Sequence, residues 1–73
     1  MYYENLVFSR HAIQQMFYRR ISQKEVKTAI SYGEVIEENP DDTPYPSYLI
    51  LDFIEGKLCE ISLLADWADA IIC

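Results

Sequence analysis

One histidine and one arginine on the same predicted helix face are the residues best suited to chemistry in this 73-residue chain. His11, Gln15 and Arg19 recur at intervals of four, so a helix brings them to one face. An imidazole can take a 2′-hydroxyl proton from RNA, and a guanidinium can hold the phosphate. The spacing predicts His11 and Arg19 as a catalytic pair, with Gln15 binding substrate. The alternative is that His11 packs between helix and sheet, hydrogen-bonded to a carbonyl or an aspartate.

Tyrosines are the second group of candidate contact residues, and the chain contains six. Tyr45 and Tyr48 flank a proline-rich loop, where they could bind substrate by stacking on bases. Use in the core or in a partner interface is the alternative for all six. Asp41 and Asp42 in the same loop are expected to be solvated. The chain shows no metal-ligand spacing and no glycine-rich phosphate loop, so we predict neither a metal site nor a cofactor.

Charge is divided unevenly along the chain, although the net charge is only −6. Residues 1–33 carry a balance of +3, whereas residues 34–73 carry −9. Nucleic acid would therefore contact the first part, because phosphate is repelled by the second. A basic protein partner would suit the second part instead. An ordinary solvated surface is the alternative explanation for this asymmetry.

Length and composition predict one domain, residues 1–73, near the lower limit for a self-sufficient core. A membrane span would need a run of about eighteen apolar residues, which the chain lacks. The first residues also lack the basic start and apolar run of a secretory signal. We therefore expect a cytoplasmic protein in which Cys59 and Cys73 are reduced.

Two helices with clear start signals are predicted, one from residue 10 to residue 19 or 20 and one over 23–32. Ser9 suits the N-cap of the first helix, because its hydroxyl can accept from an unpaired backbone amide. Ser22 and Glu25 form a capping box at the start of the second. Apolar residues at helical spacing predict the buried sides of both helices. These are Ala12, Ile13, Met16 and Phe17 in the first helix, and Val26, Ala29 and Ile30 in the second.

The chain after Gly33 is predicted to form strands, and Gly33 itself to end the second helix in the left-handed conformation. The fold class is therefore α+β: two N-terminal helices packed on a small antiparallel sheet of three to four strands. The last strand ends on apolar residues, which predicts a homo-oligomer formed through it or a shortened chain. The expected strands cover 34–37, 47–54, 57–64 and 68–73, with 6–8 as a short strand or an extended lead-in.

The hairpin around Gly56 can be aligned in two ways. A three-residue turn over 54–56 places Leu51 opposite Cys59, so that apolar residues face apolar residues. It also puts Gly56 at the left-handed position of such a turn. A two-residue turn would place Leu51 opposite Glu60 instead. We therefore predict the three-residue turn.

Several motifs, taken in chain order, resemble the bacterial and archaeal family called domain of unknown function 4258. The resemblance covers nearly the whole chain. The motifs are Phe8-Ser9-Arg10-His11-Ala12, Arg19-Arg20-Ile21-Ser22, Gly33-Glu34-Val35-Ile36-Glu37, Pro40-Asp41-Asp42 and Tyr45-Pro46-Ser47-Tyr48-Leu49.

The family is similar in layout to small RelE-like toxins, in which helices precede an antiparallel sheet that holds an RNA-cleaving site. The resemblance implies that the family's histidine is His11 and its helix-end arginine is Arg19. Family members usually carry Arg where this chain has Gln15, and Gly where it has Arg20. They also continue through a Thr-x-Tyr segment, before which this chain ends at Cys73. The resemblance therefore also allows an inactive or truncated copy, or one that a partner completes.

Two functions remain open, and the sequence leaves it undecided whether the protein is an enzyme. The first is a toxin-like protein that cleaves or binds RNA through the first helix. It predicts that basic side chains of that helix converge on a groove. The second is a non-catalytic protein-interaction module that forms a homo-oligomer or binds a protein partner. It predicts a buried or carbonyl-bonded His11 and an exposed apolar patch.

Overall fold

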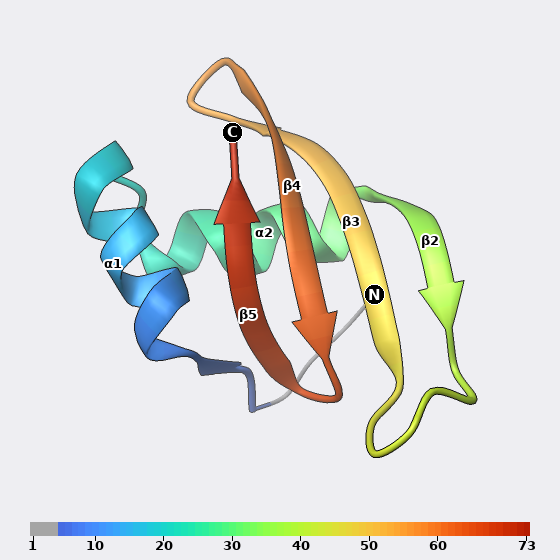
Figure 1. The fold of residues 1–73 in the computed structure, drawn as a ribbon. Coiled ribbons are helices and arrows are strands. Elements are labelled where there is room, and N and C mark those ends of the chain that lie inside the picture. Colours follow the sequence, from blue (N-terminus) through green and yellow to red (C-terminus); the bar gives the residue numbers. More distant parts are fainter. Residues whose placement is uncertain (1–4) are drawn as a thin grey trace.

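The computed structural model describes residues 5–73 and shows two helices packed on one face of a five-stranded sheet (Figure 1). The strand order is β1-β5-β4-β3-β2. The elements are β1 (Val7–Phe8), α1 (Arg10–Arg19), α2 (Gln23–Tyr32), β2 (Glu34–Asn39), β3 (Ser47–Ile54), β4 (Lys57–Leu64) and β5 (Trp67–Ile72).

The α+β class is confirmed, but the sheet has five strands and is mixed. Val7 and Phe8 form the additional strand, which pairs in parallel with Trp67 and Ala68 of β5. A strand of two residues has no alternation to detect, and its partner lies at the other end of the chain. The sequence allowed a short strand at 6–8, but it did not predict the parallel pairing that makes the sheet mixed and five-stranded.

Both predicted helix starts are confirmed. The Ser9 hydroxyl accepts from the Ala12 amide at 3.0 Å. The Ser22 amide donates to Glu25 at 2.9 Å, and the Glu25 amide donates to the Ser22 hydroxyl at 3.1 Å. These bonds satisfy amides that a helix leaves unpaired in its first turn.

The predicted buried side of α2 is confirmed, whereas the predicted buried side of α1 included two residues that are exposed. Ala12 and Met16 are buried, but Ile13 and Phe17 keep 49% and 81% of their surface exposed. The helix α1 lies against β5 at one margin of the sheet, so only a narrow row of its side chains is covered.

The backbone conformation of Gly33, at the end of α2, differs from the predicted left-handed one. Gly33 has extended backbone (φ −73°), and a Cβ there would lie 2.5 Å from the Ala29 carbonyl oxygen and 2.7 Å from Ile50. Its glycine is therefore required by close packing of α2 on β3. The left-handed end belongs to α1, where Arg20 has φ 56° and its amide donates to the Met16 and Phe17 carbonyls.

The β3–β4 hairpin corrects the predicted register. It has a two-residue turn, Glu55 and Gly56, with φ values of 53° and 77°, and Leu51 pairs with Glu60. Two positive φ values match the twist of a hairpin with a turn of this length. Apolar residues on both faces of β3 made the register ambiguous in sequence. As a result Ile50 and Ile54 face the helices, while Leu51 and Phe53 face away from them.

The core lies between the helices and one face of the sheet. Cys59 also faces this core, and its sulfur is bonded to Cys73, so the expectation of reduced cysteines is not what the structure shows. No helix among residues 5–73 is long and apolar enough to cross a membrane. The buried residues are Ala12, Met16, Ile21, Val26, Ala29, Ile30, Ile50, Ile54, Cys59, Ile61, Leu63, Ala68 and Ile71.

Candidate functional site

The predicted catalytic residues lie on α1, and both are exposed. His11 and Arg19 are eight residues apart, which separates them by about 12 Å along a helix axis. No residue within 5–73 forms a hydrogen bond or an ion pair with either side chain. His11 therefore does not pack between helix and sheet, as the alternative required. The two residues share a helix face, about two turns apart.

Gln15, between them on the same face, contacts the sheet. Its side-chain oxygen accepts from the Ile71 amide at 2.7 Å. At the N-cap of α1, the Ser9 hydroxyl donates to the Asp69 carbonyl at 2.7 Å. These two side chains satisfy backbone groups on the outer edge of β5, beyond its short pairing with β1. Gln15 thus holds α1 against β5 in this structure.

The two tyrosines predicted to bind substrate are separated by the fold. Tyr48 is half-buried and packs against the core on the helix side of the sheet. Tyr45 is 57% exposed, in the loop before β3. Tyr2 and Tyr3 lie outside the described residues.

The outer side of α1 combines cations with exposed aromatic rings. Phe17 and Tyr18 are 81% and 85% exposed, and their rings meet edge to face with centroids 6.3 Å apart. Arg19 and Arg20 follow them at the helix end, and both are exposed. Cationic and aromatic side chains together suit contact with single-stranded nucleic acid.

Among residues 5–73, no layer covers the face of the sheet that points away from the helices; we call it the open face. Phe53, Trp67 and Ile72 are 65%, 50% and 57% exposed there, and Leu58 and Leu64 are 49% and 38% exposed. Cross-strand partners point to the same side of a sheet, so the register assigns its members. The open face comprises Val7, Ser47, Leu49, Leu51, Phe53, Leu58, Glu60, Ser62, Leu64, Trp67, Ala70 and Ile72, with Glu34, Glu37 and Asn39 of β2.

The charged side chains of the open face are all acidic. Glu60 lies between Leu51 and Ile72, its cross-strand neighbours, at the centre of the apolar residues. Glu34 and Glu37 border it on β2, the strand at one edge of the sheet. Among residues 34–73 the single cation is Lys57, which pairs with Ile54 on the other face. The open face is therefore an apolar surface that carries acidic groups and no cation from residues 34–73.

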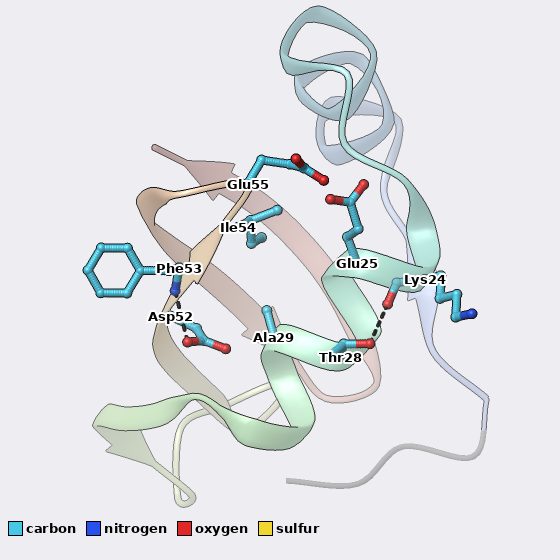
Figure 2. A pocket seen from close by; sticks show the side chains of 8 residues that line it. All are labelled: Lys24, Glu25, Thr28, Ala29, Asp52, Phe53, Ile54 and Glu55. Carbon is cyan, nitrogen blue, oxygen red and sulfur yellow. Dashed lines mark hydrogen bonds between the residues drawn. The ribbon is translucent and has the colours of Figure 1, made fainter.

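A hollow of about 240 Å³ lies between α2 and the β3–β4 turn (Figure 2). The carboxyl groups of Glu25 and Glu55 point toward each other across it. A hydrogen bond with Glu25 and the charge of that neighbour raise the pKa of Glu55. The hydrogen bond from Glu55, with that from the Ser22 amide, lowers the pKa of Glu25. The opposite shifts of these two pKa values make this contact between α2 and the hairpin sensitive to pH.

Sequence reasoning missed this carboxyl pair, because its members are 30 positions apart and meet only through the two-residue turn. Asp52 also lines the hollow, but its oxygen accepts from the Phe53 amide at 2.8 Å. Within residues 5–73, no group of three or more His, Cys, Asp or Glu side chains is arranged to hold a metal ion.

A second hollow, of about 320 Å³, lies where the loop before β3 meets the β4–β5 turn; we call it the turn pocket. Tyr45 is one of the two tyrosines predicted to bind substrate, whereas no site was predicted at the β4–β5 turn. Residues distant in sequence form it, and their proximity follows from the strand order. The lining residues are Tyr45, Leu64, Ala65, Asp66, Trp67 and Asp69.

The architecture is that of a small α+β domain with one covered and one uncovered sheet face. The chain belongs to the family described as Domain of unknown function (DUF4258), which matches residues 8–61, from the end of β1 into β4. The resemblance noted from the motifs is thereby confirmed. No curated protein and no solved structure matches the chain.

Proposed function

We propose that this protein is a non-catalytic interaction module whose open face binds a basic, apolar segment of a protein partner. The observation that carries the proposal is the exposure of large apolar side chains, such as Phe53, Trp67 and Ile72, on one uncovered sheet face. Contiguous exposed apolar surface is typical of interaction sites, because leaving it in water forgoes burial free energy.

The charge of the open face indicates the chemistry of the partner. Glu34, Glu37 and Glu60 share this face with no cation among residues 34–73. Complementary charge speeds encounter and excludes wrong partners. Two copies placed open face to open face would bring these glutamates together, which disfavours a symmetric dimer of that kind. A segment with apolar residues flanked by Lys or Arg fits instead.

The experiment uses a defined probe, an amphipathic helical peptide of leucine and lysine, compared with the same peptide carrying glutamate for lysine. Trp67 is the single tryptophan and lies on the open face, so its fluorescence reports binding. We expect the lysine peptide to bind and the glutamate peptide not to bind. Added salt should weaken the complex, because it screens the charges.

Two charge reversals decide which face is used. Glu60→Lys places a cation at the centre of the open face and should weaken lysine-peptide binding about tenfold or more. Glu38→Lys is the matched control, because Glu38 pairs with Tyr48 on the other face. Equal binding by both variants, or equal binding of both peptides, would refute the proposal. Light scattering of the protein alone tests the alternative that a second copy of the chain covers the open face.

RNA contact through α1 is the second candidate function. The exposed cations of this helix and the adjacent Phe17 and Tyr18 rings favour it. RNA binding should fall steeply as salt rises from about 50 to 200 mM, because released counterions drive it. Cleavage lost in His11→Ala and Arg19→Ala, with folding intact, would assign the predicted catalytic pair. Unchanged RNA and no binding at low salt would leave the interaction module.

A further inference from the structure

We propose that the turn pocket binds a guanidinium group, supplied by an arginine side chain of the partner. The source of the cation rests on the proposed function, because the pocket lies at one end of the open face, beside Leu64 and Trp67. The pocket itself can be tested with a small molecule and without any partner.

The aromatic residues of the pocket are Tyr45 and Trp67, which are 57% and 50% exposed. Flat ring faces attract cations through their quadrupoles, and tryptophan does so most strongly. A guanidinium is planar and weakly hydrated, so it stacks on such rings at a smaller desolvation cost than an ammonium. The volume of about 320 Å³ leaves room for that group and part of its aliphatic stem.

Among residues 5–73, the acids of the pocket, Asp66 and Asp69, have no cationic partner. No side chain among residues 5–73 forms a hydrogen bond or an ion pair with either carboxylate. Lys57 lies near the β3–β4 turn, at the opposite end of the sheet from this β4–β5 turn (Figure 1). The carboxylates are therefore available to a cation from outside, and a guanidinium offers donors to both.

Backbone bonds fix the position of each wall. The Ala65 amide donates to the Pro46 carbonyl at 2.8 Å, which joins the Tyr45 loop to the β4–β5 turn. The Val7 amide donates to the Asp66 carbonyl at 2.9 Å. Asp69 lies at the irregularity in the β4–β5 register, and the Ser9 hydroxyl binds its carbonyl. Such irregularities redirect a side chain. The site is thus formed before the ligand arrives, which lowers the entropic cost of binding.

The test measures Trp67 fluorescence during titration with Nα-acetyl-arginine amide. The matched ligands are Nα-acetyl-citrulline amide, which is neutral and nearly isosteric, and Nα-acetyl-lysine amide. We expect saturable binding of the arginine compound, weaker binding of the lysine compound, and none of the citrulline compound. Equal responses to arginine and citrulline would overturn the inference.

Variants locate the binding within the pocket. Asp66→Asn and Tyr45→Ala should each weaken arginine binding about fivefold, since a charge pair or a cation–ring contact is lost. Asp41→Asn is the control, because Asp41 is an exposed acid that does not line the pocket. If neither Asp66→Asn nor Tyr45→Ala changed the affinity for the arginine compound, the inference would also be overturned.

The two proposals can fail separately. If the lysine peptide binds the open face while arginine amide does not bind at all, the interaction module stands and the turn pocket is excluded as a guanidinium site. If arginine amide binds through Asp66 and Tyr45 while Glu60→Lys leaves peptide binding intact, the pocket stands and the open face is excluded.

Discussion

On the covered face of the sheet, Ile50, Ile61 and Leu63 lose all contact with water, whereas on the open face Phe53 and Ile72 keep more than half of their surface exposed. All five side chains are large and apolar, and they lie on three neighbouring strands, β3, β4 and β5. Their different surroundings come from the helices, which cover one side only. Residue type therefore does not distinguish a core position from a contact position in this sheet.

This difference separates stability from binding. Burial on the covered face supplies free energy of folding, while the open face can supply free energy only when a partner covers it. Substitutions on the two faces should therefore affect different measurements. The following predictions test this separation, in order of decreasing expected effect.

The largest difference is expected between Ile61→Ala and Phe53→Ala. Ile61 is fully buried, so its truncation leaves a cavity and should cost about 3–4 kcal/mol of unfolding free energy. Phe53 is 65% exposed, so its truncation should cost less than about 1 kcal/mol. Urea denaturation followed by circular dichroism measures both. Similar losses of unfolding free energy in the two variants would show that the open face stabilises the fold as much as the covered face does.

The second prediction concerns how the covering layer is attached. Ser9 caps α1 and also bonds to the Asp69 carbonyl of β5, whereas Ser22 only caps α2. Ser9→Ala should therefore cost about 2 kcal/mol and Ser22→Ala about 1 kcal/mol. The same denaturation measurement compares them. If Ser22→Ala lowered the unfolding free energy more than Ser9→Ala did, the hydrogen bond between Ser9 and the Asp69 carbonyl would contribute nothing measurable.

The third prediction strengthens the covering layer. Arg20 ends α1 in the left-handed region, which disfavours every residue with a Cβ. Arg20→Gly should raise the unfolding free energy by about 0.5–1 kcal/mol, after the greater freedom of glycine in the unfolded chain is subtracted. Arg19→Gly is the control, since glycine inside a helix should lower the unfolding free energy by about 1 kcal/mol. Thermal denaturation should shift in opposite directions for the two variants.

The smallest effect is expected at the border of the covered face, in the contact between Glu25 and Glu55. The raised pKa of Glu55 gives stability at low pH that is lost as the pH rises through this pKa. The lowered pKa of Glu25 gives stability at neutral pH that is lost as the pH falls through it. Glu55→Gln removes the first contribution and keeps a donor for Glu25.

The Glu55→Gln variant should therefore gain stability relative to the natural chain as the pH rises from about 4 to about 7. Denaturation midpoints at both pH values measure this gain, which should shrink in high salt. Glu60→Gln on the open face is the control, because Glu60 faces away from α2. A parallel pH dependence in all three proteins would contradict the opposite pKa shifts of Glu25 and Glu55.

Local signals in the sequence determined the helices and the boundaries of the long strands. The caps at Ser9 and Ser22 are written in residues three positions apart, so no distant contact is needed to predict them. Helical spacing likewise identified Val26, Ala29 and Ile30 as buried. The α+β class followed from these elements in order.

The tertiary structure alone decided which face of the sheet is covered, where β1 pairs, and which side chains form a pocket. The β3 strand is apolar on both sides, so its register depended on the backbone of one turn at Glu55 and Gly56. The Glu25–Glu55 contact and the turn pocket join residues brought together by strand order. Local sequence cannot encode such contacts, because they depend on packing between segments that are distant along the chain.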